Sequence, residues 1–309
     1  MTKKTINKNA LAFLKKQNWQ KAQQLLFYNS KKNPSHQTYN NLGYYLITEG
    51  LLIKSGRTRN AFELGKKYLM KAYELERTVV NINALVKMIE FQSLSASIEE
   101  KIYLHSSARN LLKEAIQIKY SDVLQYNLLR FEYFLNPGDK YLFPQTVDLL
   151  QNYACPESAL LLLGILWEKN FYDEGVKYIG QYGHLIDKID LLMSYSKLGL
   201  YKEGCELSES IIPFYDLDDF VLSAIIECYV NTQHFSEAKK LLLVVKDRKK
   251  ESNDQEKNNF FDVIFENLSS SDIRRRNKIN NYFINPPFID SCCYFGCELH
   301  QTDWEIMKD

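Results

Sequence analysis

Apolar residues recur at three- and four-residue spacings in much of the chain, which is the pattern of helices that bury one face. The clearest stretch runs from Leu217 to Tyr229, where the apolar positions are Phe220, Val221, Ala224, Ile225, Cys228 and Tyr229. The next stretch repeats the pattern at Ala238, Leu241, Leu242 and Val245. Two such stripes on consecutive helices can pack together, so this region is predicted to form a helix pair.

A second pattern marks the start of helices. An aromatic residue is followed three positions later by a small residue at four places: Trp19 to Ala22, Tyr172 to Gly175, Tyr201 to Gly204 and Phe235 to Ala238. Tyr195 and Tyr229 lie six residues before two of these aromatics, and Gly199 marks a turn. This arrangement resembles the tetratricopeptide repeat (TPR) family. The resemblance implies helix-turn-helix units stacked into a right-handed α–α superhelix, a solenoid.

The centre of the chain is less regular. Residues 39–45 resemble the first-helix signature of the family, and a second helix is predicted from about Arg59 to Arg77. Further helix pairs are predicted at about 79–118 and 121–153, the latter interrupted by the turn Asn136-Pro137-Gly138. The prediction is therefore an all-α fold of about seven TPR-like pairs over residues 1–250, followed by a helical cap and cysteine-bearing tail over residues 251–309.

Asparagine recurs at similar positions of three predicted first helices. Asn41, Asn83 and Asn127 each precede an apolar or small pair, at spacings close to one repeat. TPR proteins bind peptides on the concave face lined by first helices. Stacked amides there would offer donors and acceptors to a peptide main chain. We therefore predict Asn41, Asn83 and Asn127, with Tyr45, as peptide-binding residues; chance recurrence in an asparagine-rich chain is the alternative.

The amino-acid composition and the lengths of the apolar runs limit the fold class and the cellular location. Glycine (12) and proline (7) are scarce and hydrophobic content is 45%, as expected for a helical protein with a substantial core. No secretory signal is visible, and the longest apolar run, Ala159 to Trp167, is too short to cross a bilayer. A soluble, cytoplasmic protein is predicted, without membrane contact.

Charge is distributed unevenly along the chain. Residues 1–120 contain 20 basic and 8 acidic side chains, whereas residues 121–309 contain 19 and 30. The net charges of +12 and −11 predict attraction of an acidic partner or head-to-tail self-association. A chance distribution over solvated helix faces explains the same numbers.

The tail contains a cluster of reactive side chains. Three of the six cysteines, Cys292, Cys293 and Cys297, lie close to His300. Thiolates and imidazole suit zinc, and residues 293, 297 and 300 can share a helix face. The spacing differs from that of a standard zinc knuckle, and no second Cys-x-x-Cys pair completes the ligands. Zinc binding, thiol chemistry and structural packing therefore remain as alternatives for these four residues.

Catalytic signatures are missing from the sequence. It contains no phosphate-binding glycine loop, no His-Glu-x-x-His helix and no Gly-x-Ser-x-Gly elbow, so an enzyme is not expected. Nucleic-acid binding is disfavoured by the acidic second part of the chain.

The leading hypothesis is a non-catalytic scaffold or adaptor that binds a protein or peptide. The alternatives are a metal- or thiol-dependent protein acting through the tail, and a cytoplasmic peptide-sensing regulator, because the chain also resembles the peptide-pheromone receptors of Gram-positive bacteria.

Overall fold

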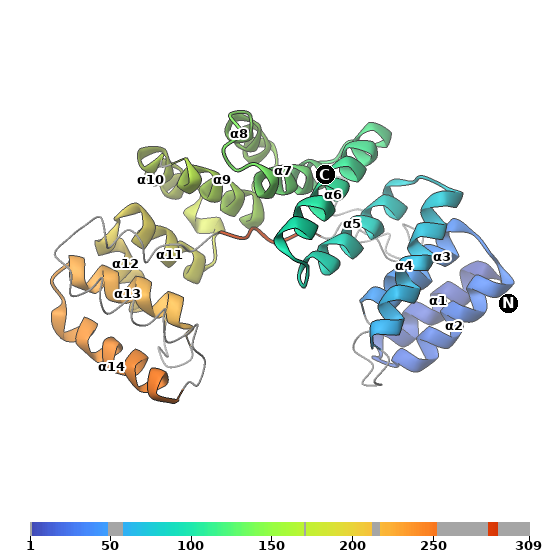
Figure 1. Ribbon diagram of the computed structural model, residues 1–309, viewed down its shortest axis with the longest axis horizontal. Helices are drawn as coiled ribbons and strands as arrows, with labels where there is room; N and C mark the ends of the chain where they lie inside the picture. The colour runs from blue at the N-terminus through green and yellow to red at the C-terminus, as the bar shows by residue number, and fades with distance from the viewer. Residues whose placement is uncertain (1, 49–57, 170, 212–216, 252–283, 290–309) are drawn as a thin grey trace. The chain divides into compact units, whose positions relative to one another are not determined.

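The computed structural model describes residues 2–48, 58–169, 171–211, 217–251 and 284–289 (Figure 1). Over these ranges the chain forms fourteen α-helices, one short 3-10 helix and no strand. The prediction of an all-α fold is confirmed for this part of the chain. No helix in the described ranges is both long enough and apolar enough to cross a membrane. The predicted tail, 251–309, lies outside the described residues except for residue 251 and the segment 284–289.

The described residues divide into two compact units. The first contains the residues up to Gln145 together with Phe288 and Ile289, and the second contains the residues from Thr146 to Pro287. This division falls within α8 (Leu142–Asn152), whereas the sequence predicted a boundary near residue 250. A short stretch distant in sequence therefore belongs to the N-terminal unit.

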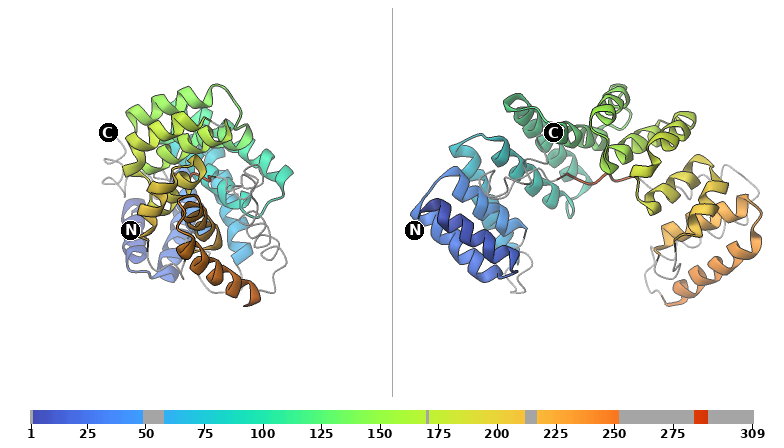
Figure 2. Two further views of the ribbon diagram at one scale, coloured as in Figure 1. Left: turned by 90° about the vertical axis from the view of Figure 1, so that its left-hand side faces the viewer. Right: turned by 180° about the vertical axis from the view of Figure 1, so that it is seen from behind.

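The first unit consists of successive antiparallel helix pairs. Its helices are α1 (Lys3–Lys15), α2 (Trp19–Lys32), α3 (His36–Ile47), α4 (Thr58–Leu75), α5 (Val79–Ser93), α6 (Ile98–Ile118) and α7 (Asp122–Leu135). Each helix contacts the next one along the chain, and α3 also contacts α5. Figure 2 shows the N-terminal pairs, in blue, packed side by side. Side-chain caps start several of these helices, among them Ser35 for α3, Thr78 for α5 and Ser121 for α7.

The second unit continues the same alternation. After α8 come α9 (Pro156–Glu168), α10 (Tyr172–Tyr182), a 3-10 turn (Gly183–Leu185), α11 (Lys188–Leu198), α12 (Tyr201–Ser208), α13 (Asp219–Asn231) and α14 (Phe235–Glu251). Consecutive helices from α9 to α14 contact one another, and α11 contacts α13. In the ranges predicted to form pairs, 79–118 contains α5 and α6, which contact each other, and 121–153 contains the helices α7 and α8.

The four predicted helix starts are confirmed. Helices α2, α10, α12 and α14 begin at Trp19, Tyr172, Tyr201 and Phe235. At the two small residues three positions later that are glycine, a side chain of the neighbouring helix approaches closely. A Cβ atom on Gly204 would lie 2.5 Å from Cys228 Sγ, and one on Gly175 would lie 2.9 Å from a Leu198 methyl group. Gly199, predicted in a turn, ends α11 with a φ of +74°, a conformation that favours glycine.

Two apolar clusters form the core of the first unit. One joins α1 to α4 and includes Leu26, Leu42 and Tyr45. The other joins α3 and α4 to α5, α6 and α7 and includes Leu85, Leu112 and Phe131. Phe288 packs against the second cluster. The C-terminal residues thus contact the helices on which Asn83 and Asn127 lie.

Candidate functional site

The candidate site is one face of α5 together with one face of α7. On α5 the residues are Asn83, Lys87, Glu90 and Phe91. On α7 they are Asn127, Arg130, Phe131 and Phe134. Spacings of three and four residues place each set on one side of its helix. We call these eight residues the α5–α7 face.

Asn127 connects this face to the C-terminal segment. Its Nδ2 donates a hydrogen bond to the carbonyl oxygen of Ile289 at 2.8 Å, and its Oδ1 accepts one from the Ile289 N–H at 3.1 Å. The Asn127 side chain is completely buried. Both main-chain groups of one residue are therefore satisfied by a single amide. An amide can recognise an extended chain in this way whatever its side chains are.

Phe288 provides a side-chain anchor beside this main-chain contact. Lys87 Nζ lies 5.1 Å from the centre of its ring, and the Arg130 guanidinium lies 6.0 Å away. The ring also lies 6.3 Å from that of Phe131. Cations over an aromatic face attract its negative quadrupole. The α5–α7 face therefore offers both a main-chain contact and a cation-lined place for an aromatic ring.

A buried ion pair fixes α5 to α7 beneath this ring. Arg130 Nη1 and Nη2 lie 3.0 and 2.6 Å from the two carboxylate oxygens of Glu90. The Arg130 side chain is 3% exposed and that of Glu90 14%. The guanidinium also stacks over Phe134 at 4.6 Å. A planar guanidinium paired at two points is held in a fixed orientation, so its face stays directed at the aromatic rings.

His105, from α6, completes the aromatic cluster. Its ring centre lies 5.3 Å from that of Phe131 and 5.4 Å from that of Phe134. Burial lowers the pKa of His105 below its usual 6.5, and Arg130 and Lys101 act in the same direction while Glu90 opposes them. The imidazole is therefore neutral near pH 7 and packs as an aromatic ring.

The predicted peptide-binding asparagines all lie on first helices of pairs, namely α3, α5 and α7. Asn41, Asn83 and Asn127 are 1%, 2% and 0% exposed. Asn127 pairs with a main chain, as described above. For Asn41, neither Nδ2 nor Oδ1 has a hydrogen-bond partner among the described residues. An unpaired buried amide costs about 1–3 kcal/mol, so this position requires an explanation.

Tyr45 has a different environment from the one predicted. Its side chain is fully buried in the cluster formed by α1 to α4. Its hydroxyl donates a hydrogen bond to the Trp19 carbonyl oxygen at 2.9 Å. The ring joins α3 to the start of α2 and is not exposed to a ligand. We therefore assign Tyr45 to packing and leave it out of the proposed groove.

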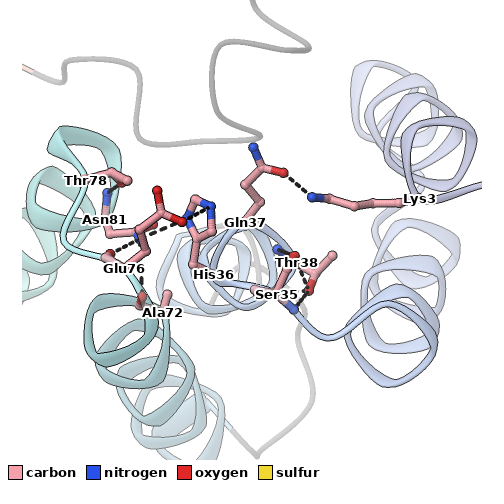
Figure 3. Close-up of polar contacts among 9 residues, drawn as sticks. All are labelled: Lys3, Ser35, His36, Gln37, Thr38, Ala72, Glu76, Thr78 and Asn81. Carbon is pink, nitrogen blue, oxygen red and sulfur yellow. Dashed lines mark hydrogen bonds and ion pairs between the residues drawn. The ribbon is translucent and has the colours of Figure 1, made fainter.

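A second polar cluster, which the sequence did not predict, connects α3, α4 and α5 (Figure 3). Asn81 Nδ2 donates to the carbonyl oxygens of Ala72 at 3.2 Å and Glu76 at 2.6 Å, and lies 3.1 Å from His36 Nδ1. His36 Nε2 lies 2.9 Å from the Glu76 carboxylate. We call His36, Glu76 and Asn81 the helix clasp.

The predicted metal or thiol residues Cys292, Cys293, Cys297 and His300 lie outside the described residues. Within the described ranges, no group of histidine, cysteine and acidic residues has the arrangement of a metal site. Cys155, Cys205 and Cys228 are free thiols there. Burial raises the pKa of each of these thiols, most strongly that of Cys228. These three cysteines are thus in the unreactive thiol form.

Comparison with protein-family models, curated proteins and solved structures finds no match for this chain. The function is therefore argued from the α5–α7 face itself.

Proposed function

We propose that this protein is a non-catalytic scaffold that binds an extended peptide segment of a partner protein along α3, α5 and α7. The observation that carries the proposal is the pairing of the Asn127 amide with both main-chain groups of Ile289. In this proposal the helix pairs continue as a TPR-like superhelix, and its concave face is the one that presents the asparagines.

The chemistry of the α5–α7 face favours a particular kind of peptide. Main-chain pairing by an amide gives affinity without sequence preference, whereas the cation-lined position beside Lys87 and Arg130 selects an aromatic ring. The ion pair between Arg130 and Glu90 pre-organises this position, so little ordering is needed on binding. The preferred ligand is therefore an extended chain that carries an aromatic side chain.

Asn41 supports an extension of the peptide site to α3. It precedes Leu42-Gly43 as Asn127 precedes Leu128-Leu129, and its buried amide has no hydrogen-bond partner within the part of the chain that the structure describes. A peptide main chain bound there would satisfy the amide and remove its energetic cost. The Nδ2 of Asn81, by contrast, donates to two carbonyl oxygens of the protein.

A peptide-library selection tests this proposal. Random twelve-residue peptides are selected on the full chain, and in parallel on a chain carrying Phe288→Ala, in which the site is less occupied by its own segment. Enriched peptides are then titrated against Asn41→Leu. We expect affinity to fall about tenfold, the value of one lost hydrogen bond to a buried group. The melting temperature should stay equal or rise, because leucine needs no partner.

Asn60→Leu is the matched control, because Asn60 is an exposed asparagine on α4. It should leave peptide affinity unchanged. Failure to enrich peptides on either chain would contradict the proposed function. Equal affinity of Asn41→Leu and the parent chain for every enriched peptide would exclude α3 from the site.

A further inference from the structure

We infer that Phe288 and Ile289 are a built-in ligand of the peptide site, so that an incoming peptide of the same chemistry must displace the protein's own segment. This inference rests on the proposed function and deepens it. It names both the ligand class, an extended peptide with phenylalanine followed by a main-chain-paired residue, and the means by which the site is kept closed.

The segment is non-helical and is restrained by prolines. Residues 284–289 form no helix, although helices dominate the rest of the described chain. Pro286 and Pro287 fix their own φ angles and disfavour the helical region for the residue before each of them. Phe288 and Ile289 follow directly after these two restrained residues. Pre-organisation of this kind lowers the entropy cost of binding.

Two residues of the segment contact the α5–α7 face. Phe288 occupies the position beside Lys87, Arg130 and Phe131. Ile289 makes the two main-chain hydrogen bonds with Asn127. Asn285, by contrast, is exposed. Ile284 and Pro286 of the same segment are also buried. The contacts of Phe288 and Ile289 with the α5–α7 face are strengthened by their tether to the same chain.

The tether determines the size of the effect. A segment linked to its own site experiences an effective concentration on the order of 1 mM. If two residues alone bind with a Kd of about 100 μM, the site is occupied roughly ten times more often than it is free. The apparent affinity for an added peptide is then lowered about tenfold, because only the open fraction binds it. A partner peptide must therefore bind tightly enough to compete with the protein's own segment.

The probe for the test is a fluorescent synthetic peptide with the sequence of residues 283–290, Phe-Ile-Asn-Pro-Pro-Phe-Ile-Asp. Its binding to the full chain is measured by fluorescence polarisation. We expect the Phe288→Ala chain to bind this probe about tenfold more tightly than the unchanged chain, for the reason above. Asn285→Ala, in the same segment, should bind the probe as the unchanged chain does.

A second variant separates displacement from misfolding. Ile289→Pro keeps the Phe288 ring but removes the N–H that donates to Asn127 Oδ1. It should also tighten probe binding, with a melting temperature close to that of the unchanged chain. Addition of Asn127→Leu to the Phe288→Ala chain should then abolish the gain.

Equal probe affinity of the unchanged, Phe288→Ala and Ile289→Pro chains would overturn the inference, as would tight binding that survives Asn127→Leu. Absence of probe binding to all chains would also overturn it. If library peptides still bind under either result, the proposed function stands and only the built-in ligand fails. Failure of library peptides on both chains contradicts the proposed function directly.

Discussion

Two buried asparagines of the first unit both pair their side-chain amides with main-chain groups, but the partners differ in kind. The amide of Asn81, in the helix clasp, pairs with the carbonyl oxygens of Ala72 and Glu76, which lie only 9 and 5 residues away. The amide of Asn127, on the α5–α7 face, pairs with Ile289, 162 residues away. One amide joins consecutive helices, and the other holds a segment that approaches from outside the helix pair.

The difference lies in what happens when the contact opens. The partners of Asn81 belong to the end of α4 and the turn before α5, so they cannot move to water without disturbing the packing of both helices. The partner groups of Asn127 belong to a short non-helical segment, and in the inference above this segment leaves the site and is hydrated. Buried amide pairing thus stabilises a fold when its partner is fixed, and serves recognition when its partner can exchange.

The largest effect is expected from the ion pair that underlies the α5–α7 face. Arg130→Met leaves the Glu90 carboxylate buried without its partner, and breaking a buried pair in this way costs about 3 kcal/mol of unfolding free energy. Urea unfolding measures this loss. The double variant Arg130→Met with Glu90→Leu should recover most of it, since no charge is then stranded.

This experiment tests whether the α5–α7 face, which holds the exchangeable segment, is itself held rigidly by the ion pair. If Arg130→Met left the midpoint of urea unfolding unchanged, the α5–α7 face would itself be adaptable. The distinction between a fixed support and an exchangeable segment would then be lost.

A smaller effect separates the two asparagines directly. Asn81→Ala removes the amide from two carbonyl oxygens that stay in place, and should cost about 2 kcal/mol of unfolding free energy. Asn127→Ala should cost about 1 kcal/mol or less, because the released segment regains hydrogen bonds to water. Denaturant titration of both variants at one temperature gives the comparison. Equal losses, or a larger loss for Asn127→Ala, would mean that the Ile289 contact is as much a part of the fold as the helix clasp.

Local sequence patterns predicted the helices but only part of the site. The starts of α2 and α12, at Trp19 and Tyr201, follow from an aromatic residue and a nearby small residue, both within one turn of the helix end. Asn127 was predicted to bind a main chain. Its partner, Ile289, was not predicted, because no local pattern encodes a contact across 162 residues.

Two other features show where periodicity fails. Tyr45 lies on α3, where every residue from Thr38 to Ile47 is buried, so spacing alone could not identify a ligand-facing side. Glu90 and Arg130 did leave a signal in the sequence. Each is a charged residue within an apolar run, in Met88-Ile89-Glu90-Phe91 and Leu128-Leu129-Arg130-Phe131. A charge in such a position must be paired when buried. Glu90 and Arg130 are 40 residues apart, about one repeat, and this spacing indicates that each is the other's partner.

The smallest effect concerns pH and distinguishes the two regions through their histidines. His105 packs between the rings of Phe131 and Phe134, near Arg130, Lys101 and Glu90, and its pKa is lowered in the folded chain mainly by burial. As the pH falls below 6.5, the unfolded chain therefore binds a proton at His105 before the folded chain does. The His105 contribution to stability is complete above this pH and is lost as the pH falls towards the folded pKa.

Thermal unfolding at about pH 7.5 and about pH 5.5 should show a melting-temperature decrease that is smaller in His105→Gln than in the unchanged chain. His36 in the helix clasp, by contrast, faces the Glu76 carboxylate at 2.9 Å. If His105→Gln had the same pH dependence as the unchanged chain, the burial of His105 among the aromatic rings would not be the source of the effect.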